Sequence, residues 1–267
     1  MGDTVDPSME ISADAAATTQ QEINAEIASF SAAYRAQVNG RPPETQPRLD
    51  YPPYRSSFLR HPTKELQHAD PEAIELAAPV FGSGDVGDLE ADLTIQHSGE
   101  PIGERLVVTG RVVDGDGRPV VGQLVEIWQA NAAGRYIHER DQHHAPIDPN
   151  FTGAGRCLTG PDGSYRFTTI KPGPYPWRNH HNAWRPAHIH FSVFGSEFTQ
   201  RAVTQMYFPG DPLFDLDPIY QAVLDAAARA RLLAAYDHDV TAPEQNTGYR
   251  WDIVLTGSRA TPMDGAS

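Results

Sequence analysis

The sequence predicts an all-β protein: an antiparallel β-sandwich core with irregular loops, an N-terminal helix and one helix in the C-terminal half. Short runs of alternating apolar and polar residues recur from residue 104 onward, and tight turns separate them. The 23 prolines and 22 glycines indicate many turns and ordered loops. At 267 residues, the chain is long enough for one large all-β domain or two small ones.

Seven strands are expected, and turn sequences connect four of them in two pairs. Asp114–Gly117 and Gly160–Gly163 each lie between two alternating runs, which predicts two hairpins. The Ala- and Leu-rich segment Tyr220–Tyr236 predicts a helix, and Gly82–Gly103 is interpreted as a loop. The expected strands are Leu106–Val113, Val120–Gln129, Arg156–Thr159, Ser164–Ile170, His188–Val193, Val203–Phe208 and Tyr249–Thr256.

The chain is expected to divide into an N-terminal extension, residues 1–50, and a β-sandwich domain, residues 51–267. Residues 1–17 are acidic and then rich in Ala and Thr, which predicts disorder. A helix is expected from Thr18 or Thr19, and it is too short to form a domain, so it should dock on the main body or on another subunit. Its apolar stripe consists of Ile23, Ile27, Phe30, Tyr34 and Val38.

Charge and composition exclude several classes of function. The formal net charge of −14 argues against binding to nucleic acids and to anionic membranes. No segment approaches the ~20 apolar residues that a membrane-spanning helix requires, and the N-terminus lacks the features of a secretory signal. A single cysteine, Cys157, excludes an intrachain disulfide framework and fits a reducing cytoplasm, where we expect the protein to be located. We interpret this cysteine as a buried, small apolar residue.

Two histidines on a predicted strand are the first indication of a metal site. Successive strand side chains point to opposite faces, so His188 and His190 share one face. Such a pair could equally be ordinary polar residues, and a metal site would need ligands from elsewhere in the chain. The adjacent histidines at 143–144 and 180–181 cannot share a strand face, so we interpret them as solvated loop residues.

Two tyrosines are the best candidates for further ligands. Tyr175 lies between Pro174 and Pro176 in a rigid, extended loop, which suggests that its phenol oxygen is needed in one place. Tyr136 follows the strand that ends at residue 129, although alone it could be a rim aromatic. Ionising a free tyrosine at pH 7 costs about 4 kcal/mol, which a trivalent cation offsets by its own charge. Spacing alone therefore indicates no more than a possible ferric site.

Longer motifs extend this interpretation. They are Gly134-Arg135-Tyr136, Asp148–Phe151, Gly155–Thr159, Ile170–Trp177 and Trp184–Phe191. Together they resemble the intradiol ring-cleaving dioxygenases, over a region from about Tyr51 to Leu255. The resemblance implies a β-sandwich core and a non-haem Fe(III) held by two tyrosines, two histidines and a solvent hydroxide. Mapped by motif, the metal ligands would be Tyr136, Tyr175, His188 and His190.

The resemblance also implies catalytic roles for two residues. Tyr175 would be the axial ligand that leaves the iron when a catechol binds and that then acts as a base. Arg185 would stabilise the ketonised substrate by its fixed charge, although without the resemblance a structural salt bridge would be the better interpretation.

Four further residues are expected around these groups, and each could instead be an ordinary packing or surface residue. Gln205 matches a glutamine near the iron pocket, and Trp177 matches a wall of the substrate site. Tyr54 matches a tyrosine that meets the carboxylate end of the substrate. Asp141, five residues after Tyr136, is expected to orient the Tyr136 loop through hydrogen bonds.

The expected activity is cleavage of protocatechuate with O₂ to 3-carboxy-cis,cis-muconate. The Pro-Tyr-Pro-Trp sequence and the single predicted N-terminal helix favour protocatechuate over catechol, hydroxyquinol or another substituted catechol, which remain alternatives. In family members that cleave protocatechuate, a homologous α subunit without iron ligands completes the pocket in a larger symmetric assembly, so we expect such a partner. A non-catalytic β-sandwich binding subunit is the alternative from another class.

Overall fold

The computed structural model describes residues 21–22, 24–25, 28–29, 43–48, 50–59, 83–141, 143–178, 181–195 and 201–264. The chain divides into two compact units, Met1–Gly40 and Arg41–Ser267. In the first unit, the described residues between 21 and 29 are helical and exposed, within the predicted helix. The predicted apolar stripe from Ile23 to Val38 lies outside the described residues, so its docking role stays a prediction.

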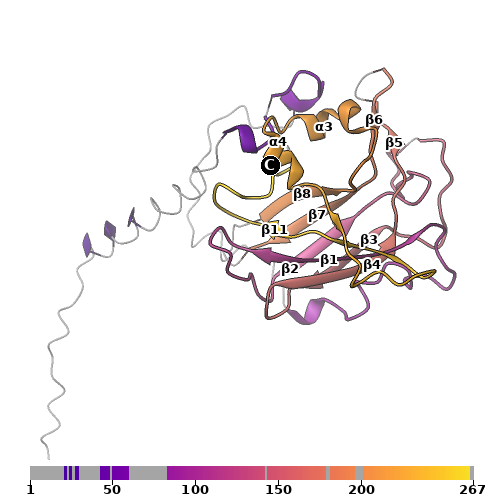
Figure 1. Ribbon diagram of the computed structural model, residues 1–267, viewed down its shortest axis with the longest axis horizontal. Helices are drawn as coiled ribbons and strands as arrows, with labels where there is room; N and C mark the ends of the chain where they lie inside the picture. Colours follow the sequence, from indigo (N-terminus) through magenta and orange to yellow (C-terminus); the bar gives the residue numbers. More distant parts are fainter. Residues whose placement is uncertain are drawn as a thin grey trace, which may run out of the picture. The chain divides into compact units, whose positions relative to one another are not determined.

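The second unit is built from two β-sheets. A five-stranded sheet has the order β11-β1-β10-β9, with β4 on the other edge of β1. A four-stranded sheet has the order β3-β2-β7-β8, and β5 and β6 form a separate pair (Figure 1). The strands are β1 (Arg105–Val113), β2 (Leu124–Trp128), β3 (Ala154–Leu158), β4 (Ser164–Ile170), β5 (Tyr175–Pro176), β6 (Trp184–Arg185), β7 (His188–Phe194), β8 (Arg201–Tyr207), β9 (Ala235–Tyr236), β10 (Thr247–Arg250) and β11 (Ile253–Val254).

The predicted all-β sandwich is confirmed, with one difference in strand direction. The four-stranded sheet is antiparallel throughout, and β1 pairs with β4 antiparallel. On its other edge, however, β1 pairs in parallel with both β10 and β11. Parallel neighbours need a long connection, and the chain supplies one because strands β2 to β9 lie between β1 and β10 in the sequence. The run predicted as one strand, Tyr249–Thr256, is thus divided between two short strands.

Both predicted turns form, but the hairpin ladders expected around them do not. Gly117 and Gly163 adopt positive φ angles of 83° and 78°, which favour glycine. After the first turn, the chain makes only a bridge between Val113 and Pro119 before β2 enters the other sheet. After the second turn, β3 stays with β2 while β4 joins β1. Each turn therefore links the two sheets, because a turn reverses the chain but the apolar faces decide which strands pair.

Among the described residues of the second unit, the helices are few and short. The 3₁₀ turns are η1 (Pro43–Thr45), η2 (Ser57–Leu59), η3 (Ser83–Asp85) and η4 (Phe214–Leu216), and the α-helices are α3 (Pro218–Gln221) and α4 (Ala226–Ala230). Apart from η3 and a bridge from Asp92 to Thr168, the predicted loop at 82–103 is irregular in its described part.

The single helix predicted over 220–236 is wrong in extent, because the structure has two helices there. Asp217 caps α3 by accepting from the Ile219 N–H, and Asp225 caps α4 by accepting from the Ala228 N–H. After α4, the backbone pairs with Tyr207 of β8 instead of continuing the helix. Figure 1 shows both helices on the side of β7 and β8.

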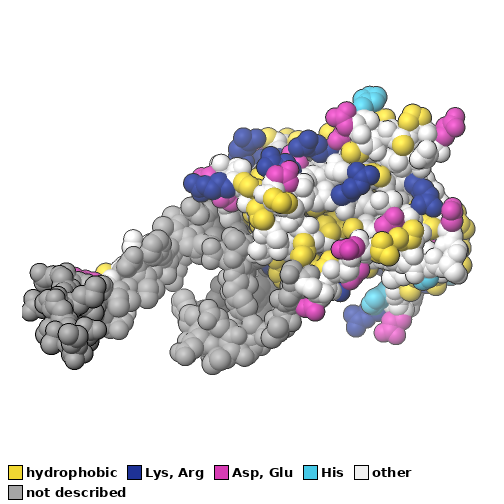
Figure 2. All heavy atoms as spheres, turned by 90° about the horizontal axis from the view of Figure 1, so that it is seen from below, with side chains coloured by type: hydrophobic (Ala, Val, Ile, Leu, Met, Phe, Trp, Pro, Cys, Tyr) yellow, Lys and Arg dark blue, Asp and Glu magenta, His cyan; other side chains and the backbone are white. Residues whose placement is uncertain are grey.

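The surface carries mixed charge despite the net charge of −14. On the face drawn in Figure 2, basic and acidic side chains are interspersed, and neither sign forms a continuous block. No helix in the described part of the chain is long and apolar enough to cross a membrane.

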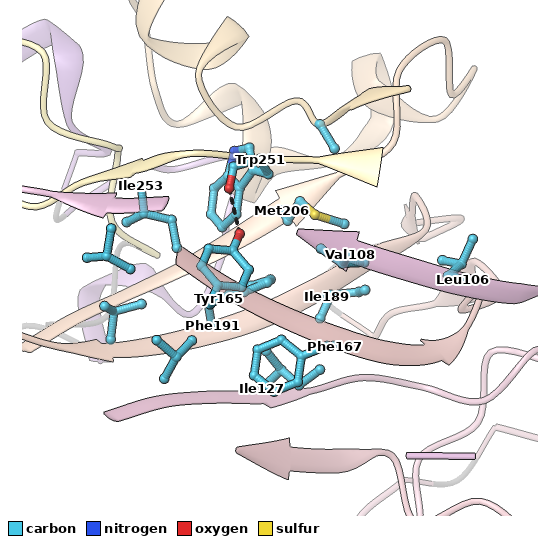
Figure 3. Close-up of a cluster of buried hydrophobic side chains, with 14 of the residues drawn as sticks. Leu106, Val108, Ile127, Tyr165, Phe167, Ile189, Phe191, Met206, Trp251 and Ile253 are labelled. Carbon is cyan, nitrogen blue, oxygen red and sulfur yellow. Dashed lines mark hydrogen bonds between the residues drawn. The ribbon is translucent and has the colours of Figure 1, made fainter. Parts of the chain in front are cut away.

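The core lies between the two sheets (Figure 3). The Phe191 ring from β7 meets the Trp251 ring at 4.9 Å and the Tyr165 ring of β4 at 5.7 Å, which joins the sheets through edge contacts. Tyr165 is held there because its hydroxyl donates to the Trp251 carbonyl oxygen at 2.6 Å. Since Phe191 and the other odd-numbered residues of β7 face this core, His188 and His190 face outward from the sandwich.

Candidate metal centre

The outward face of β7 places two imidazoles side by side. The Nε2 atoms of His188 and His190 are 3.2 Å apart. His188 is 2% exposed. The ring of His190 stacks on the ring of Trp128 from β2, with centroids 4.9 Å apart and planes inclined by 5°. Both ring orientations are therefore fixed by packing against neighbouring groups.

Hydrogen-bond geometry assigns the tautomer of one of these imidazoles. His188 Nδ1 lies 2.7 Å from the Pro186 carbonyl oxygen, and a carbonyl can only accept, so Nδ1 carries the hydrogen and Nε2 a lone pair. Burial lowers the pKa of His190, and burial and then the Arg185 charge lower the pKa of His188 well below its usual range. Both rings are therefore neutral near pH 7 and suited to act as metal ligands.

Tyr175 comes next to this pair from the β5–β6 hairpin. Its hydroxyl oxygen is 3.2 Å from His188 Nε2 and 3.4 Å from Arg185 Nη1. The cross-strand register pairs Tyr175 with Arg185, so the hairpin itself sets two of the predicted site residues side by side.

Tyr136 completes the cluster of predicted ligands. Its ring meets the Tyr175 ring edge-on at 5.5 Å and lies 6.4 Å from the His190 ring. Its hydroxyl is buried without a hydrogen-bond partner among the described residues. Burial and then the nearby Tyr175 raise the pKa of Tyr136 well above its usual range. The structure thus brings all four predicted ligands together.

The four side chains fit a hard cation. Burying the Tyr136 hydroxyl without a hydrogen-bond partner among the described residues costs free energy. The lone pair on His188 Nε2 faces His190 Nε2 at 3.2 Å. A metal ion would satisfy both, and a trivalent ion would also favour ionised phenols. In the part of the chain that the structure describes, no group of three or more His, Cys, Asp or Glu side chains is suited to a metal, so a four-donor site here needs both tyrosines.

The loop that carries Tyr136 is fixed at both ends. The Asp141 carboxylate accepts hydrogen bonds from the backbone N–H groups of Tyr136 at 2.8 Å and His143 at 2.9 Å. Gly134 has a φ of 77°, and a Cβ there would lie 2.2 Å from the Pro174 carbonyl oxygen. Only glycine fits this close approach, which sets the Tyr136 loop against the segment that carries Tyr175.

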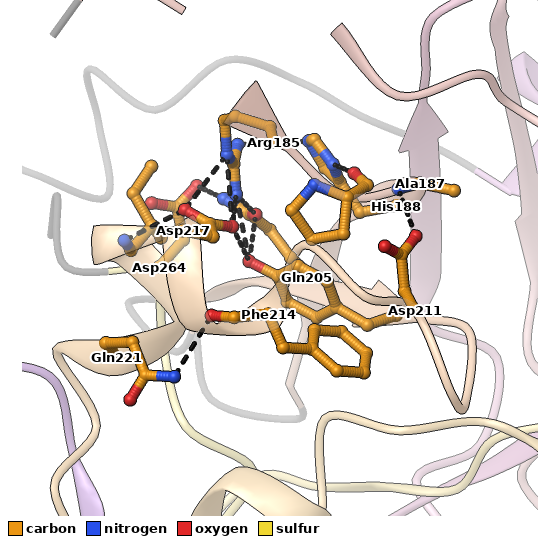
Figure 4. A network of polar contacts seen from close by, with 12 residues as sticks. Arg185, Ala187, His188, Gln205, Asp211, Phe214, Asp217, Gln221 and Asp264 are labelled. Carbon is orange, nitrogen blue, oxygen red and sulfur yellow. Dashed lines mark hydrogen bonds and ion pairs between the residues drawn. The ribbon is translucent and has the colours of Figure 1, made fainter. Parts of the chain in front are cut away.

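Arg185 is buried beside the ligands at 3% exposure, and Asp217, its ion-pair partner, is fully buried (Figure 4). Its Nε and Nη2 atoms donate to the Asp217 carboxylate at distances of 3.0 to 3.3 Å, while Nη1 lies 3.0 Å from His188 Nε2. Burial opposes the charge, but the Asp217 carboxylate, together with the nearby Tyr207 and Tyr175 phenols, raises the pKa of Arg185 well above its usual range. The site therefore contains a fixed positive charge with one nitrogen directed toward the ligands.

Gln205 and Tyr207 on β8 extend this network. The Gln205 side-chain oxygen accepts from Arg185 Nη2, and the Tyr207 hydroxyl accepts from the same nitrogen at 2.9 Å. The Gln205 amide nitrogen donates in turn to Asp264 at 2.8 Å. Gln205 therefore bridges the arginine and a carboxylate from the C-terminal segment.

The predicted substrate residues Trp177 and Tyr54 are neighbours. Their rings meet edge-on at 4.8 Å, and the Arg185 guanidinium lies 5.9 Å from the Trp177 ring centroid. Trp177 lines a hollow beside Tyr136 and Tyr175, whereas Tyr54 is buried and is not among the residues that line this hollow.

A hollow of about 480 Å³ opens beside the predicted ligands. Its lining residues are Tyr136, Arg140, Asp141, His143, His144, Tyr175, Pro176, Trp177 and Arg178. The sequence interpretation of His143 and His144 as solvated loop residues did not indicate that both line this hollow.

Sequence reasoning missed Asp217, Asp264, Tyr207 and Trp128. Signals existed for two of them: Tyr207 lies two residues after Gln205 and so shares its strand face, and Asp217 precedes a proline as a helix N-cap does. The other two gave no comparable signal, since Asp264 is far from any motif and Trp128 is one of several aromatics.

Comparison with known proteins agrees with this geometry. A family model described as "Dioxygenase" matches residues 76–257, and one described as "Protocatechuate 3,4-dioxygenase beta subunit N terminal" matches residues 40–72. The chain therefore belongs to the intradiol ring-cleaving dioxygenase family, as the sequence motifs predicted. The match begins at residue 40, earlier than the predicted start at Tyr51.

Within this family, the chain is 56% identical to the protocatechuate 3,4-dioxygenase beta chain of Burkholderia cepacia over 222 residues, which covers 82% of this chain and 94% of that one. It is 32% identical to the alpha chain from the same organism over 162 residues, covering 60% and 76% of the two chains. A hydroxyquinol 1,2-dioxygenase from Rhizobium sp. (strain MTP-10005) is 36% identical over 129 residues, covering 44% and 42%.

Proposed function

We propose that this chain is an iron-bearing subunit that cleaves protocatechuate with O₂, between its two hydroxyl-bearing carbons, to 3-carboxy-cis,cis-muconate. The observation that carries this proposal is the convergence of two phenols and two imidazoles beside a hollow. Protocatechuate is favoured because the 56% identical relative is a protocatechuate 3,4-dioxygenase beta chain, whereas the hydroxyquinol dioxygenase matches less than half of the chain.

Tyr136, Tyr175, His188 and His190 would hold a non-haem Fe(III) ion. When bound, the ion would supply Lewis acidity that makes the hydroxyl groups of the catechol easier to deprotonate. The remaining chemistry would belong to side chains that the structure describes.

Tyr175 would remove a proton from the substrate. Its half-buried phenol lines the hollow, so an entering catechol hydroxyl can reach its oxygen. As a phenolate, this oxygen would accept the proton and then hold it as a neutral phenol. Arg185 Nη1, 3.4 Å from that oxygen, would stabilise the negative charge that passes to the substrate.

The carboxylate end of the substrate would meet the basic rim of the hollow. Arg140 and Arg178 both line it and would offset the unfavourable field of a chain with a net charge of −14. Trp177 would form one wall. Tyr54, expected from the sequence to meet the carboxylate, would act from behind Trp177 through their edge contact.

Visible spectroscopy and metal analysis test the iron site. We expect the purified protein to be red-brown, because tyrosinates bound to Fe(III) absorb visible light by charge transfer. Tyr136→Phe and Tyr175→Phe should each weaken the band, whereas Tyr249→Phe, on a strand of the other sheet, should leave it unchanged. An iron-replete but colourless protein would falsify the two-tyrosinate site.

A substrate panel tests the activity itself. Protocatechuate should give a much higher kcat/KM than catechol or hydroxyquinol, with ring cleavage followed by product absorbance. Highest kcat/KM on one of the other catechols would replace the substrate proposal. Absence of turnover on every catechol, with iron bound, would favour the non-catalytic binding subunit instead.

The chain would work with a homologous α partner in a larger assembly located in the cytoplasm. The alpha chain of Burkholderia cepacia is a homologue of this chain at 32% identity. Phe58 and Leu59, four and five residues after Tyr54, are exposed apolar side chains that such a partner would cover. Oligomeric mass and kcat/KM should be compared for the chain produced alone and with the partner. Equal activity from a homo-oligomer of this chain would contradict the proposal.

A further inference from the structure

We infer that Asp264, a residue of the C-terminal segment, is a positioning residue that orients His190 and Gln205 within the site. The inference rests on the proposed metal site. The role of Asp264 is indirect, because its carboxylate acts through these two side chains.

The C-terminal segment is pinned along β8. The Asp264 N–H donates to the Val203 carbonyl oxygen at 2.8 Å, and the Thr204 hydroxyl donates to the Pro262 carbonyl oxygen at 2.7 Å. Thr261 is buried and pairs with the backbone of β11. The segment thus reaches β8, the neighbour of the strand that carries the histidines, in a defined register.

The carboxylate of Asp264 enters the site from this position. Its Oδ2 atom accepts from the Gln205 amide nitrogen at 2.8 Å and lies 3.7 Å from His190 Nδ1. The side chains of His190 and Asp264 are only 13% and 12% exposed. His190 Nδ1 is buried without a hydrogen-bond partner among the described residues, so this carboxylate is the acceptor available to it.

This placement would fix two features of the site. A carboxylate facing Nδ1 favours the tautomer with hydrogen on that atom, which leaves the lone pair on Nε2 directed at His188. The bond to the Gln205 amide nitrogen also turns the side-chain oxygen of Gln205 toward Arg185, which donates to it. One carboxylate therefore supports both a ligand and the fixed cation.

The alternative is that Asp264 only anchors the C-terminal segment. Three variants separate these roles. Asp264→Asn keeps the shape and the backbone contact but removes the negative charge, whereas Thr261→Val removes the hydrogen bond that the Thr261 hydroxyl accepts from the Val254 N–H and leaves the carboxylate in place. Asp264→Ala removes both the carboxylate and the acceptor for Gln205.

The first measurement is made on the iron-loaded protein with its partner. Loss of orienting groups around metal ligands typically costs 10–100-fold in metal affinity, so we expect Asp264→Ala to lose iron to a chelator about 10–100-fold more readily. Asp264→Asn should fall between that variant and wild type and should shift the visible band. Thr261→Val should lower Tm with iron retention unchanged. Wild-type iron retention and band position in both Asp264 variants would overturn the inference.

The second measurement uses the metal-free protein and does not depend on iron. Imidazole ¹⁵N chemical shifts, assigned by loss of the signal in His190→Gln, should show hydrogen on Nδ1 in wild type and in Thr261→Val. In Asp264→Ala, the form with hydrogen on Nε2 should become populated. Hydrogen on Nε2 in the wild-type protein would overturn the inference, whereas failure of wild type to take up iron would overturn the proposed function alone.

Discussion

The two sheets share an apolar interior but differ in their outward faces. On β7 and β8, outward side chains such as His188 and Gln205 are buried under loops and connected to a buried ion pair. On β1 and β4, outward side chains such as Thr109, Arg111 and Arg166 are half-buried or exposed, and Arg166 makes no side-chain hydrogen bond or ion pair with described residues. The same strand alternation therefore produces a polar cluster on one sheet and a solvated surface on the other.

A second hollow lies elsewhere on the sandwich, and its volume is similar to that of the hollow beside the predicted ligands. It measures about 540 Å³ and is lined by residues of both sheets, with Arg111, Arg166 and Arg250 among them, whereas the hollow beside the predicted ligands measures about 480 Å³. The Arg250–Asp252 pair beside the larger hollow has side chains 52% and 47% exposed. The difference teaches that buried, mutually oriented polar groups identify a site better than the volume of the space beside them.

The largest contrast is expected for catalysis. Tyr175→Phe should keep most of its iron, because three ligands remain, but should lower kcat by about 10²–10⁴, the usual contribution of a general base. Tyr249→Phe on β10 is the matched control and should leave kcat unchanged. Steady-state kinetics with parallel iron analysis measures both, and a Tyr175→Phe enzyme as active as wild type would show that this phenol is not the base.

A second contrast is expected in stability, between the two arginine–aspartate pairs. Asp217→Ala leaves the Arg185 charge buried without its partner, which should lower the free energy of unfolding by about 3–5 kcal/mol. Arg250→Ala breaks an exposed pair and should cost about 0–1 kcal/mol. Denaturant unfolding of the metal-free proteins measures both values. Similar losses in the two variants would mean that burial does not distinguish the pairs.

A third contrast concerns pH and the histidines. Burial lowers the pKa of His190 and, together with the Arg185 charge, of His188. The unfolded chain, with histidine pKa values near 6.5, therefore binds protons first as the pH falls. This contribution to stability is fully present above about pH 6.5 and decreases below it, by at most about 1.4 kcal/mol per pH unit for each histidine.

Unfolding of the metal-free protein between pH 8 and pH 5, where most carboxylates stay ionised, should reveal this slope. His190→Asn removes one of the two groups and should reduce the slope to about half. An unfolding free energy that stays constant from pH 7 to pH 5 in the wild-type protein would contradict buried, neutral imidazoles.

Substitution of Cys157, which lines the larger hollow, is expected to have the smallest effect on the enzyme. Burial raises the pKa of its thiol to about 12, so few molecules carry a thiolate at pH 8. A thiol reagent should label the native protein about 10³-fold more slowly than the denatured protein, as a pKa difference of about three units requires. Cys157→Ala should keep wild-type kcat/KM. Rapid labelling of the native protein would show that the cysteine is reactive despite its burial.

Local patterns in the sequence predicted the strands well and indicated three of the four candidate ligands. β4 has the predicted bounds, and β1 begins one residue earlier than expected, because alternation and turn residues are local signals. Tyr175, His188 and His190 were found because they lie in one short stretch with unusual spacing. Their convergence with Tyr136 followed from the family motifs and not from periodicity.

Long-range pairing could not be predicted in the same way. The two turns were correct, but the choice of β4 as the partner of β1 depends on which faces bury each other across the sandwich. The Asp217 carboxylate meets Arg185 because α3 begins just beside β8. The helix predicted over 220–236 was too long and gave no indication of this contact. Such contacts join residues that no local window contains.

Strand β7 has a consequence for how the protein can change. Ile189 and Phe191 belong to the core, and His188 and His190 belong to the site, so one strand serves both with alternate residues. A one-residue shift in its register would exchange the two sets, placing imidazoles inside and apolar groups at the ligand positions. Uptake of the metal would therefore report correct strand registry, and new substrate preferences should be sought in the surrounding loops while this strand is kept unchanged.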